Sequence, residues 1–176
     1  QFSIDESFID MTGTNYLYHN YEELAYKIKN EIKEKFWYTV NVGIGNNKLC
    51  AKMASDFLKP DRVHTLFENE VESKMHPLPI EELYGIGKSS SKKLRELGIN
   101  TIGDLASANY EYLYKYFKNQ TKKIIDSARG IDDSIIVSKK NEVEGISNST
   151  TVSYNLNSLE DIYKYLYPLV ENVSIS

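Results

Sequence analysis

The chain has 176 residues with 41% hydrophobic and 26% charged residues, which is the composition of one globular domain or of two small ones. A disordered or collagen-like chain is excluded, and the formal net charge of −4, taken as a whole, argues weakly against a nucleic-acid partner. The single cysteine, Cys50, cannot form an intramolecular disulfide, so a disulfide-stapled secreted fold is also excluded.

Two features of the whole chain bear on its location and extent. No apolar run approaches the roughly 18 residues that a membrane span requires, and the first residues do not form a secretion signal. We therefore expect a cytoplasmic protein with no membrane partner. Because the sequence begins Gln1-Phe2-Ser3 without an initiator Met and opens directly on a strand pattern, we interpret it as an internal piece of a longer protein.

The first 70 residues alternate strand and helix patterns. Apolar residues recur at helical spacing through 22–36, whereas they alternate with polar residues through 38–44, as in a half-buried strand. The two strands expected first, at 2–4 and 7–11, flank a turn at Asp5-Glu6. The elements predicted in this region are strands at 2–4, 7–11, 38–44 and 63–67 and helices at 22–36 and 48–58.

After Pro77 and Pro79 the pattern changes to short helices, so we expect a domain boundary near 75–79. Helices are predicted at 80–84, 88–97, 101–107, 109–117 and 120–129. The segment 131–144 loses helical periodicity and is expected to be a linker, and a strand-like stretch at 146–156 precedes a predicted helix at 159–170. The fold class is α+β, with segments at 1–75, 76–130, 131–144 and 145–176.

Positive charge is concentrated in the middle of the chain. Residues 84–129 carry nine Lys and Arg against four Asp and Glu, while the segments on either side are acidic. A solvated helical surface would explain an excess of this size, and so would a surface that binds phosphates.

A glycine turn opens this basic segment and resembles a helix-hairpin-helix motif. The turn is Tyr84-Gly85-Ile86-Gly87-Lys88, followed by Lys92, Lys93 and Leu97-Gly98-Ile99. Two glycines allow a tight turn, after which the amides at the start of the next helix can face a phosphate. Because such contacts reach the nucleic-acid backbone and not the base edges, DNA binding without sequence preference is predicted for Gly85, Ile86, Gly87, Lys88 and Lys92. The structural alternative is a plain corner between two helices.

The second candidate site is the acidic pair Asp5 and Glu6. Neighbouring strand residues face opposite sides of a sheet, so both carboxylates can share a site only where the chain bends, as at a hairpin tip. Two carboxylates together with substrate phosphates are a usual way to hold Mg²⁺ in phosphoryl-transfer enzymes. The alternative is that the pair merely serves as turn residues.

Taken together, these stretches resemble the Y-family, or translesion, DNA polymerases, in particular the bacterial branch of SOS mutagenesis. The motifs that carry the resemblance, in the order and spacing of that family, are Ser3-Ile4-Asp5-Glu6-Ser7-Phe8-Ile9-Asp10, Val42-Gly43-Ile44-Gly45-Asn46-Asn47-Lys48, Ala51-Lys52-Met53-Ala54-Ser55, Lys59-Pro60, Tyr84-Gly85-Ile86-Gly87 and Ala128-Arg129-Gly130-Ile131-Asp132.

The resemblance implies a DNA-directed DNA polymerase that performs two-metal nucleotidyl transfer past lesions in DNA repair. It assigns 1–75 to the palm, 76–130 to the thumb and 145–176 to the start of the little finger. Asp5 and Glu6 match the catalytic, metal-binding carboxylates, and Lys59 matches the lysine that meets the triphosphate of the incoming nucleotide. The implied cofactor is Mg²⁺, as two ions in the full-length enzyme. The implied partners are primer-template DNA, deoxynucleoside triphosphates and a sliding clamp or SOS accessory proteins.

The sequence also departs from the family. The first metal-binding aspartate, the fingers and most of the little finger are not in this chain, so we expect the fragment alone to be inactive. The rival function is a non-catalytic helix-hairpin-helix DNA-binding module, and a nucleotide cyclase is a weaker alternative that does not explain the hairpin.

Several single residues have a structural explanation. Asp10 is expected to be a hydrogen-bonding residue, Cys50 a core residue, and the four tyrosines of 110–116 partly core and partly surface. The three histidines, His19, His64 and His76, show no spacing typical of a zinc site.

Overall fold

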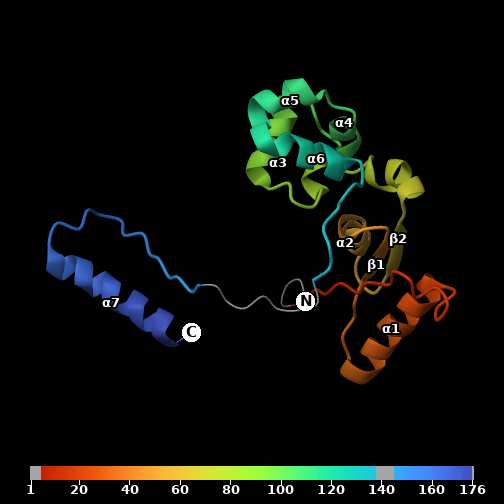
Figure 1. Ribbon diagram of the computed structural model, residues 1–176, viewed down its shortest axis with the longest axis horizontal. Helices are drawn as coiled ribbons and strands as arrows, with labels where there is room; N and C mark the ends of the chain where they lie inside the picture. The colour runs from red at the N-terminus through yellow and green to blue at the C-terminus, as the bar shows by residue number, and fades with distance from the viewer. Residues whose placement is uncertain (1–4, 138–144, 176) are drawn as a thin grey trace. The chain divides into compact units, whose positions relative to one another are not determined.

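Two parallel strands and the helix that connects them form the centre of the first part of the chain. Strand β1 (Val42–Gly45) pairs with β2 (Val63–Leu66), so that Val42 lies opposite Val63, and α2 (Lys48–Asp56) makes the crossover that parallel strands require (Figure 1). The computed structural model describes residues 5–137 and 145–175 and consists of two units, 1–136 and 137–176.

The two glycines of β1 allow α2 to lie directly against the strand. A Cβ atom at Gly43 would overlap the carbonyl oxygen of Ala51 and the amide nitrogen of Ser55. At Gly45, a Cβ atom would come within 2.7 Å of the Ala51 amide nitrogen. Any side chain at these two positions would therefore push the helix away from the sheet.

Helix α1 (Tyr21–Phe36) lies beside the strands and is tied to the turn before β2. Asn20 caps its first turn by accepting hydrogen bonds from the amides of Glu22 and Glu23. Near its other end, Lys29 and Lys33 each lie 2.7 Å from one oxygen of the Asp61 carboxylate. The Lys29 side chain is buried, whereas Asp61 and Lys33 are partly exposed, so these ion pairs lie at the edge of the unit.

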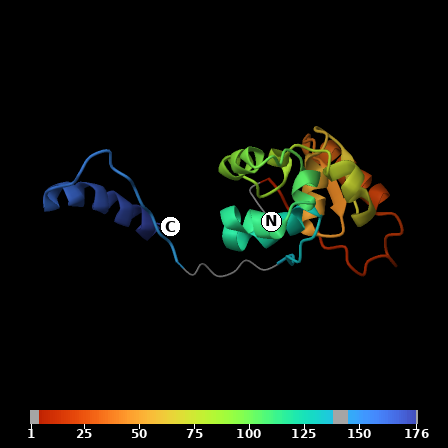
Figure 2. The same ribbon diagram turned by 90° about the horizontal axis from the view of Figure 1, so that it is seen from above.

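The helices predicted between 80 and 129 are found, and they gather into one cluster (Figures 1 and 2). The first is only a single 3-10 turn, whereas the other four form within one residue or two of the predicted limits. Their bounds, with those of the turns beside them, are η1 (Glu68–Glu70), η2 (Val71–Met75), η3 (Ile80–Glu82), α3 (Lys88–Glu96), α4 (Ile102–Ala106), α5 (Tyr110–Phe117), η4 (Lys118–Gln120) and α6 (Thr121–Ala128).

One cluster of buried side chains extends from α2 to α6. It includes Met53 on α2, Leu66 on β2 and Met75 on η2, and it continues to Leu105 and Leu113 among the helices. The π-helix η2 thus contributes to the same core as both the sheet and the helical cluster. The α+β class expected from the sequence is confirmed: helices and a small sheet are both present.

Two predicted strands are wrong and a third is shorter than expected. Residues 7–11 and 146–156 form no strand, and β1 begins at Val42 rather than at Tyr38. A strand requires a neighbour for its backbone hydrogen bonds, and the only sheet in the described part of the chain is the pair β1 and β2. The strand predicted at 2–4 lies outside the described residues.

The second unit contains one helix, α7 (Leu159–Ile175), which continues five residues past its predicted end and contains Pro168. Ser158 caps it by accepting a hydrogen bond from the Asp161 amide at 3.1 Å. None of its described side chains is buried. Across 5–137 and 145–175, we find no helix with the length and apolar character needed to cross a membrane.

Candidate functional site

The predicted acidic pair lies in the extended segment that precedes α1. Asp5 is exposed and Glu6 is half-buried. Because residues 7–11 are not a strand, the pair does not occupy the hairpin tip that the sequence predicted. The Glu6 carboxylate instead meets α2, where its Oε1 atom lies 2.5 Å from Lys52 Nζ.

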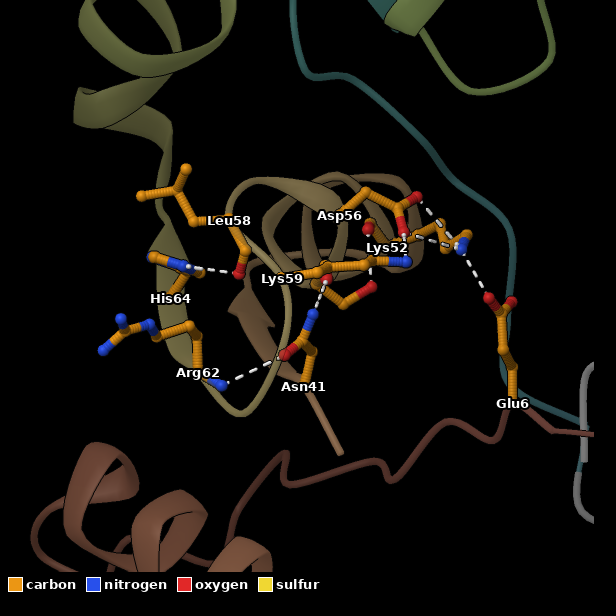
Figure 3. A network of polar contacts seen from close by, with 9 residues as sticks. Glu6, Asn41, Lys52, Asp56, Leu58, Lys59, Arg62 and His64 are labelled. Carbon is orange, nitrogen blue, oxygen red and sulfur yellow. Dashed lines mark hydrogen bonds and ion pairs between the residues drawn. The ribbon is translucent and has the colours of Figure 1, made fainter. Parts of the chain in front are cut away.

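From Lys52, a series of ion pairs continues along α2 and just past its end (Figure 3). The Lys52 ammonium group lies 3.0 Å from Asp56, one helical turn further on, and Asp56 lies 2.7 Å from Lys59 Nζ. Positions i and i+4 of a helix share one face, which is why Lys52 and Asp56 meet. The four side chains Glu6, Lys52, Asp56 and Lys59 are called the acid–base chain below.

The pKa shifts in the acid–base chain favour the charged forms. Burial alone would lower the pKa of the Lys52 ammonium, but the hydrogen bonds to Glu6 and Asp56 outweigh it, so the pKa is raised. Burial would likewise raise the pKa of the Asp56 carboxyl, yet the hydrogen bonds from Lys59 and Lys52 lower it overall. Both groups are therefore charged at neutral pH.

The acid–base chain joins two predicted sites that are separate in the sequence. Lys59, predicted to meet a triphosphate, and Glu6, predicted to hold a metal ion, are connected through Lys52 and Asp56. The role of these two connecting residues was not predicted from the sequence. Their Lys-to-Asp spacing of four within a predicted helix was the available signal.

Asp5 and Glu6 suit a hard divalent cation that takes its remaining ligands from phosphates and water. In the described residues no group of three or more His, Cys, Asp and Glu side chains is arranged to hold a metal ion. Asp10 accepts a hydrogen bond from the Thr12 amide at 2.9 Å, and its hydrogen bonds with the Thr12 side chain and amide lower the pKa of the carboxyl. That contact fits the structural role expected for Asp10.

The predicted hairpin forms a tight turn between η3 and α3. Gly85 has a φ of +90°, which favours glycine, and the Ile86 amide donates to the Leu83 carbonyl at 2.9 Å. The Ile86 side chain is buried and anchors the turn. A Cβ atom at either Gly85 or Gly87 would meet no atom within 4 Å, which means that the surface above both glycines is open.

Helix α3 begins directly after this turn, and its first backbone amides precede the first intrahelical hydrogen bond. The first intrahelical bond runs from the Ser91 amide to the Gly87 carbonyl at 2.9 Å, and Gly87 provides no side-chain cap. The amides of Lys88, Ser89 and Ser90 precede that bond, as is usual in the first turn of a helix. The open glycines and these amides lie together at the positive end of α3.

Some basic side chains of α3 already interact with other side chains of the protein, and others do not. Arg95 holds both oxygens of the Glu81 carboxylate at 2.6 and 2.7 Å, and Lys93 lies 5.0 Å from the centre of the Tyr116 ring. Lys88 and Lys92 are exposed, and neither forms an ion pair with another described residue. These two are the cations of α3 best able to meet a phosphate.

A third group of residues joins the start of α2 to the end of α6. Asn47 Nδ2 donates to the Gly130 carbonyl at 2.7 Å, and the Asp132 carboxylate accepts from the Leu49 amide at 3.2 Å. Burial raises the pKa of the neighbouring Cys50 thiol to about 11, which fits its expected core position. Both segments carry family motifs, but nothing in the sequence predicted that they meet.

The tyrosines of α5 are not core residues, which corrects one expectation. All four are exposed, and they pair at i and i+4: Tyr110 stacks on Tyr114, and Tyr112 meets Tyr116 edge to face. Leu113 is the buried residue of this helix. Because one face of an eight-residue helix is enough to fill the core here, the tyrosines remain on its outer surface.

Two family models match this chain. Residues 1–56 match the impB/mucB/samB family, and residues 68–99 match the IMS family HHH motif. The first match contains the acidic pair and all of α2, and the second contains the hairpin and α3.

Curated relatives share this sequence along nearly its full length. A DNA polymerase IV of Clostridium acetobutylicum is 44% identical over 173 residues, which cover 98% of this chain and 43% of that protein. A DNA polymerase IV of Acetivibrio thermocellus is 34% identical over 174 residues, covering 98% of this chain and 44% of that protein. The chain therefore spans less than half the length of these relatives.

Solved structures share the fold. The Y-family DNA polymerase chimera Dbh-Dpo4(243-245)-Dbh has a TM-score of 0.73 at 31% identity, covering 96% of this chain and 49% of that chain. DinB from Sulfolobus solfataricus has a TM-score of 0.66 at 30% identity, covering 99% of this chain and 51% of that chain. Motifs, fold and relatives agree: the chain belongs to the Y family of DNA polymerases.

Proposed function

We propose that this chain is part of a DNA-directed DNA polymerase that carries out translesion synthesis. The observation that carries the proposal is the acid–base chain, which links a carboxylate suited to a metal ion with a lysine suited to a triphosphate. The DNA polymerase IV relatives and the Y-family structures support the same activity.

In this proposal Asp5 and Glu6 are catalytic residues that hold Mg²⁺, two ions being present in the full-length enzyme. When bound by these carboxylates, the metal would act as a Lewis acid that would favour deprotonation of the primer hydroxyl and would neutralise charge on the triphosphate. Lys59 provides a flexible point charge for that triphosphate, a role for which a lysine is well suited. Its side chain is 57% exposed, so it can leave Asp56 and reach a nucleotide.

The hairpin is proposed to hold primer-template DNA. The open glycines, the α3 amides and Lys88 and Lys92 provide donors and positive charge for backbone phosphates. Contacts of this kind fix the position of a duplex without reading its sequence, which suits a polymerase that must move along any template.

The remaining assignments follow from family membership. Residues 1–75 are proposed as palm, 76–130 as thumb, 131–144 as linker and 145–176 as the start of the little finger. We further propose deoxynucleoside triphosphates as substrates, a sliding clamp or SOS accessory proteins as partners, and the cytoplasm as location.

The test is primer extension by the full-length protein that contains this chain. Asp5→Asn and Glu6→Gln are expected to abolish nucleotide addition while duplex affinity stays within about twofold, because each removes a metal ligand from a solvent-accessible position. Asp10→Asn is the matched control, since it alters a carboxylate of the same segment that is not assigned to the metal.

Near wild-type extension by Asp5→Asn and Glu6→Gln would reject the metal assignment. A different outcome, in which the full-length wild-type protein binds duplex DNA but extends no primer, would make the non-catalytic helix-hairpin-helix module the correct function.

A further inference from the structure

Lys52 is the most buried member of the acid–base chain. Its side chain is 13% exposed, against 34% for Glu6 and 38% for Asp56. It reaches Glu6 Oε1 at 2.5 Å and Asp56 at 3.0 Å, so one ammonium group serves two carboxylates. A largely buried lysine that pairs with two carboxylates can break one ion pair and still have its charge neutralised by the other.

A divalent cation bound by Glu6 would approach the same carboxylate that Lys52 contacts. Two positive groups at contact distance from one carboxylate repel each other, and the repulsion is stronger where water is partly excluded. A cation that binds at Oε1, the oxygen that Lys52 contacts, therefore requires Lys52 to move away from that atom. Asp56 remains in reach on the same face of α2, so this movement leaves no isolated buried charge.

We propose that Lys52 is a positioning residue that holds the Glu6 carboxylate in the metal-free protein and yields it to the incoming cation. The inference rests on the proposed function, because it takes Glu6 as a metal ligand. Lys52 keeps Glu6 against α2 before the metal arrives, and it lowers the affinity for the metal by competing for the same oxygen atoms.

The proposal is tested by Mn²⁺ titration of the full-length protein that contains this chain, with the free ion measured by electron paramagnetic resonance. Lys52→Met removes the competing ammonium and is expected to lower the Kd for Mn²⁺ by about three- to tenfold. Lys59→Met is the matched control, since it removes the same charge from the acid–base chain but has no contact with Glu6 in the described structure. Its Kd is expected to stay within about twofold of wild type.

The two lysine variants distinguish direct competition at Glu6 from a general change in charge. Equal changes of the Mn²⁺ Kd in Lys52→Met and Lys59→Met would show a general effect of charge and would overturn the proposal. An unchanged or higher Kd in Lys52→Met would overturn it as well. Glu6→Gln tests the metal assignment separately from the competition. Wild-type Mn²⁺ affinity in Glu6→Gln, or no binding by any variant, would reject the metal assignment itself, and the inference would fall with it.

A measurement on the wild-type chain covers the case in which Lys52→Met does not fold. Nuclear magnetic resonance of the lysine side chains during a Mg²⁺ titration should show the Lys52 ammonium signal shifting as it leaves Glu6. The same titration of Glu6→Gln should leave that signal unchanged. A Lys52 signal that does not respond to Mg²⁺ in a full-length wild-type protein that binds the ion would overturn the proposal.

Discussion

Asn47 and Gly130 are 83 residues apart in the sequence and are joined by a 2.7 Å hydrogen bond from Asn47 Nδ2 to the Gly130 carbonyl. The other end of the same amide, Asn47 Oδ1, caps α2 by accepting from the Cys50 amide at 2.8 Å. The Asn47 side chain thus caps the start of α2 and binds the segment that follows α6. Gly130 has a φ of +74° and lies against Val71, so the chain can pass this point only with glycine.

The two functions of Asn47 can be separated by substitution. Asn47→Ser keeps a good helix cap but cannot reach Gly130, and it should lower the free energy of unfolding by about 1 kcal/mol. Asn47→Ala loses the cap as well and should lower it by about 2 kcal/mol. Urea denaturation measures both. A fully stable Asn47→Ser variant would show that the bond to Gly130 contributes nothing.

Gly43→Ala should strongly destabilise the first unit. The new Cβ atom would overlap the backbone of α2 at Ala51 and Ser55, where neither atom can rotate away. Overpacking of this kind is expected to cost about 1–3 kcal/mol or more. Gly145→Ala is the control, because a Cβ atom there meets nothing within 4 Å. Thermal unfolding of both variants compares them directly, and equal melting temperatures would refute the close packing of α2 on β1.

The ion pairs at Asp61 should make stability depend on pH in the acid range. Hydrogen bonds from Lys29 and then Lys33 lower the pKa of the Asp61 carboxyl from 3.8 to about 2. A carboxyl group with a lower pKa in the folded state stabilises the fold at pH values above its ordinary pKa. That stabilisation is lost as the pH falls toward the pKa of the folded state. The contribution of Asp61 is therefore complete above about pH 5 and disappears between 3.8 and about 2.

This dependence is measured by comparing wild type with Asp61→Asn in urea denaturation at several pH values. Asn tolerates the left-handed backbone of this position, where φ is 62°, so the substitution tests the charge alone. The stability difference should be largest near neutral pH and should shrink toward pH 2. A difference that stays constant over this range would contradict the assigned ion pairs.

The hairpin should give weak, salt-dependent binding of duplex DNA by this chain. Engagement of two to four phosphates corresponds to a slope of about −2 to −4 for log K against log salt, at micromolar or weaker affinity. Gly87→Val should reduce the affinity without unfolding the protein, because Gly87 has an ordinary φ of −81° and open space above it. Fluorescence anisotropy over a salt series measures both quantities.

Two lysine variants test where the phosphates bind. Lys88→Ala should weaken the slope by about one unit, whereas Lys27→Ala, on the exposed face of α1, should leave affinity and slope unchanged. Unchanged binding in Gly87→Val and Lys88→Ala would mean that the phosphate contact lies elsewhere on the chain.

The sequence by itself predicted the features that depend on neighbouring residues. Helices α1 to α6 form close to where apolar spacing and capping residues indicated, and the turn at Gly85 and Gly87 was visible from its glycines. The family could also be recognised, because its motifs are short, contiguous and correctly spaced. Each of these signals is complete within a few residues of the chain.

Only the tertiary structure decided the features that depend on distant partners. A strand pattern such as 7–11 or 146–156 becomes a strand only when another strand supplies hydrogen bonds, and none does in the described residues. The contact between Lys52 and Glu6 and the bond from Asn47 to Gly130 likewise join segments far apart in the sequence. Periodicity reports which face of a segment is apolar but not which residue lies opposite it, and for that reason the acid–base chain was found in the fold and not in the sequence.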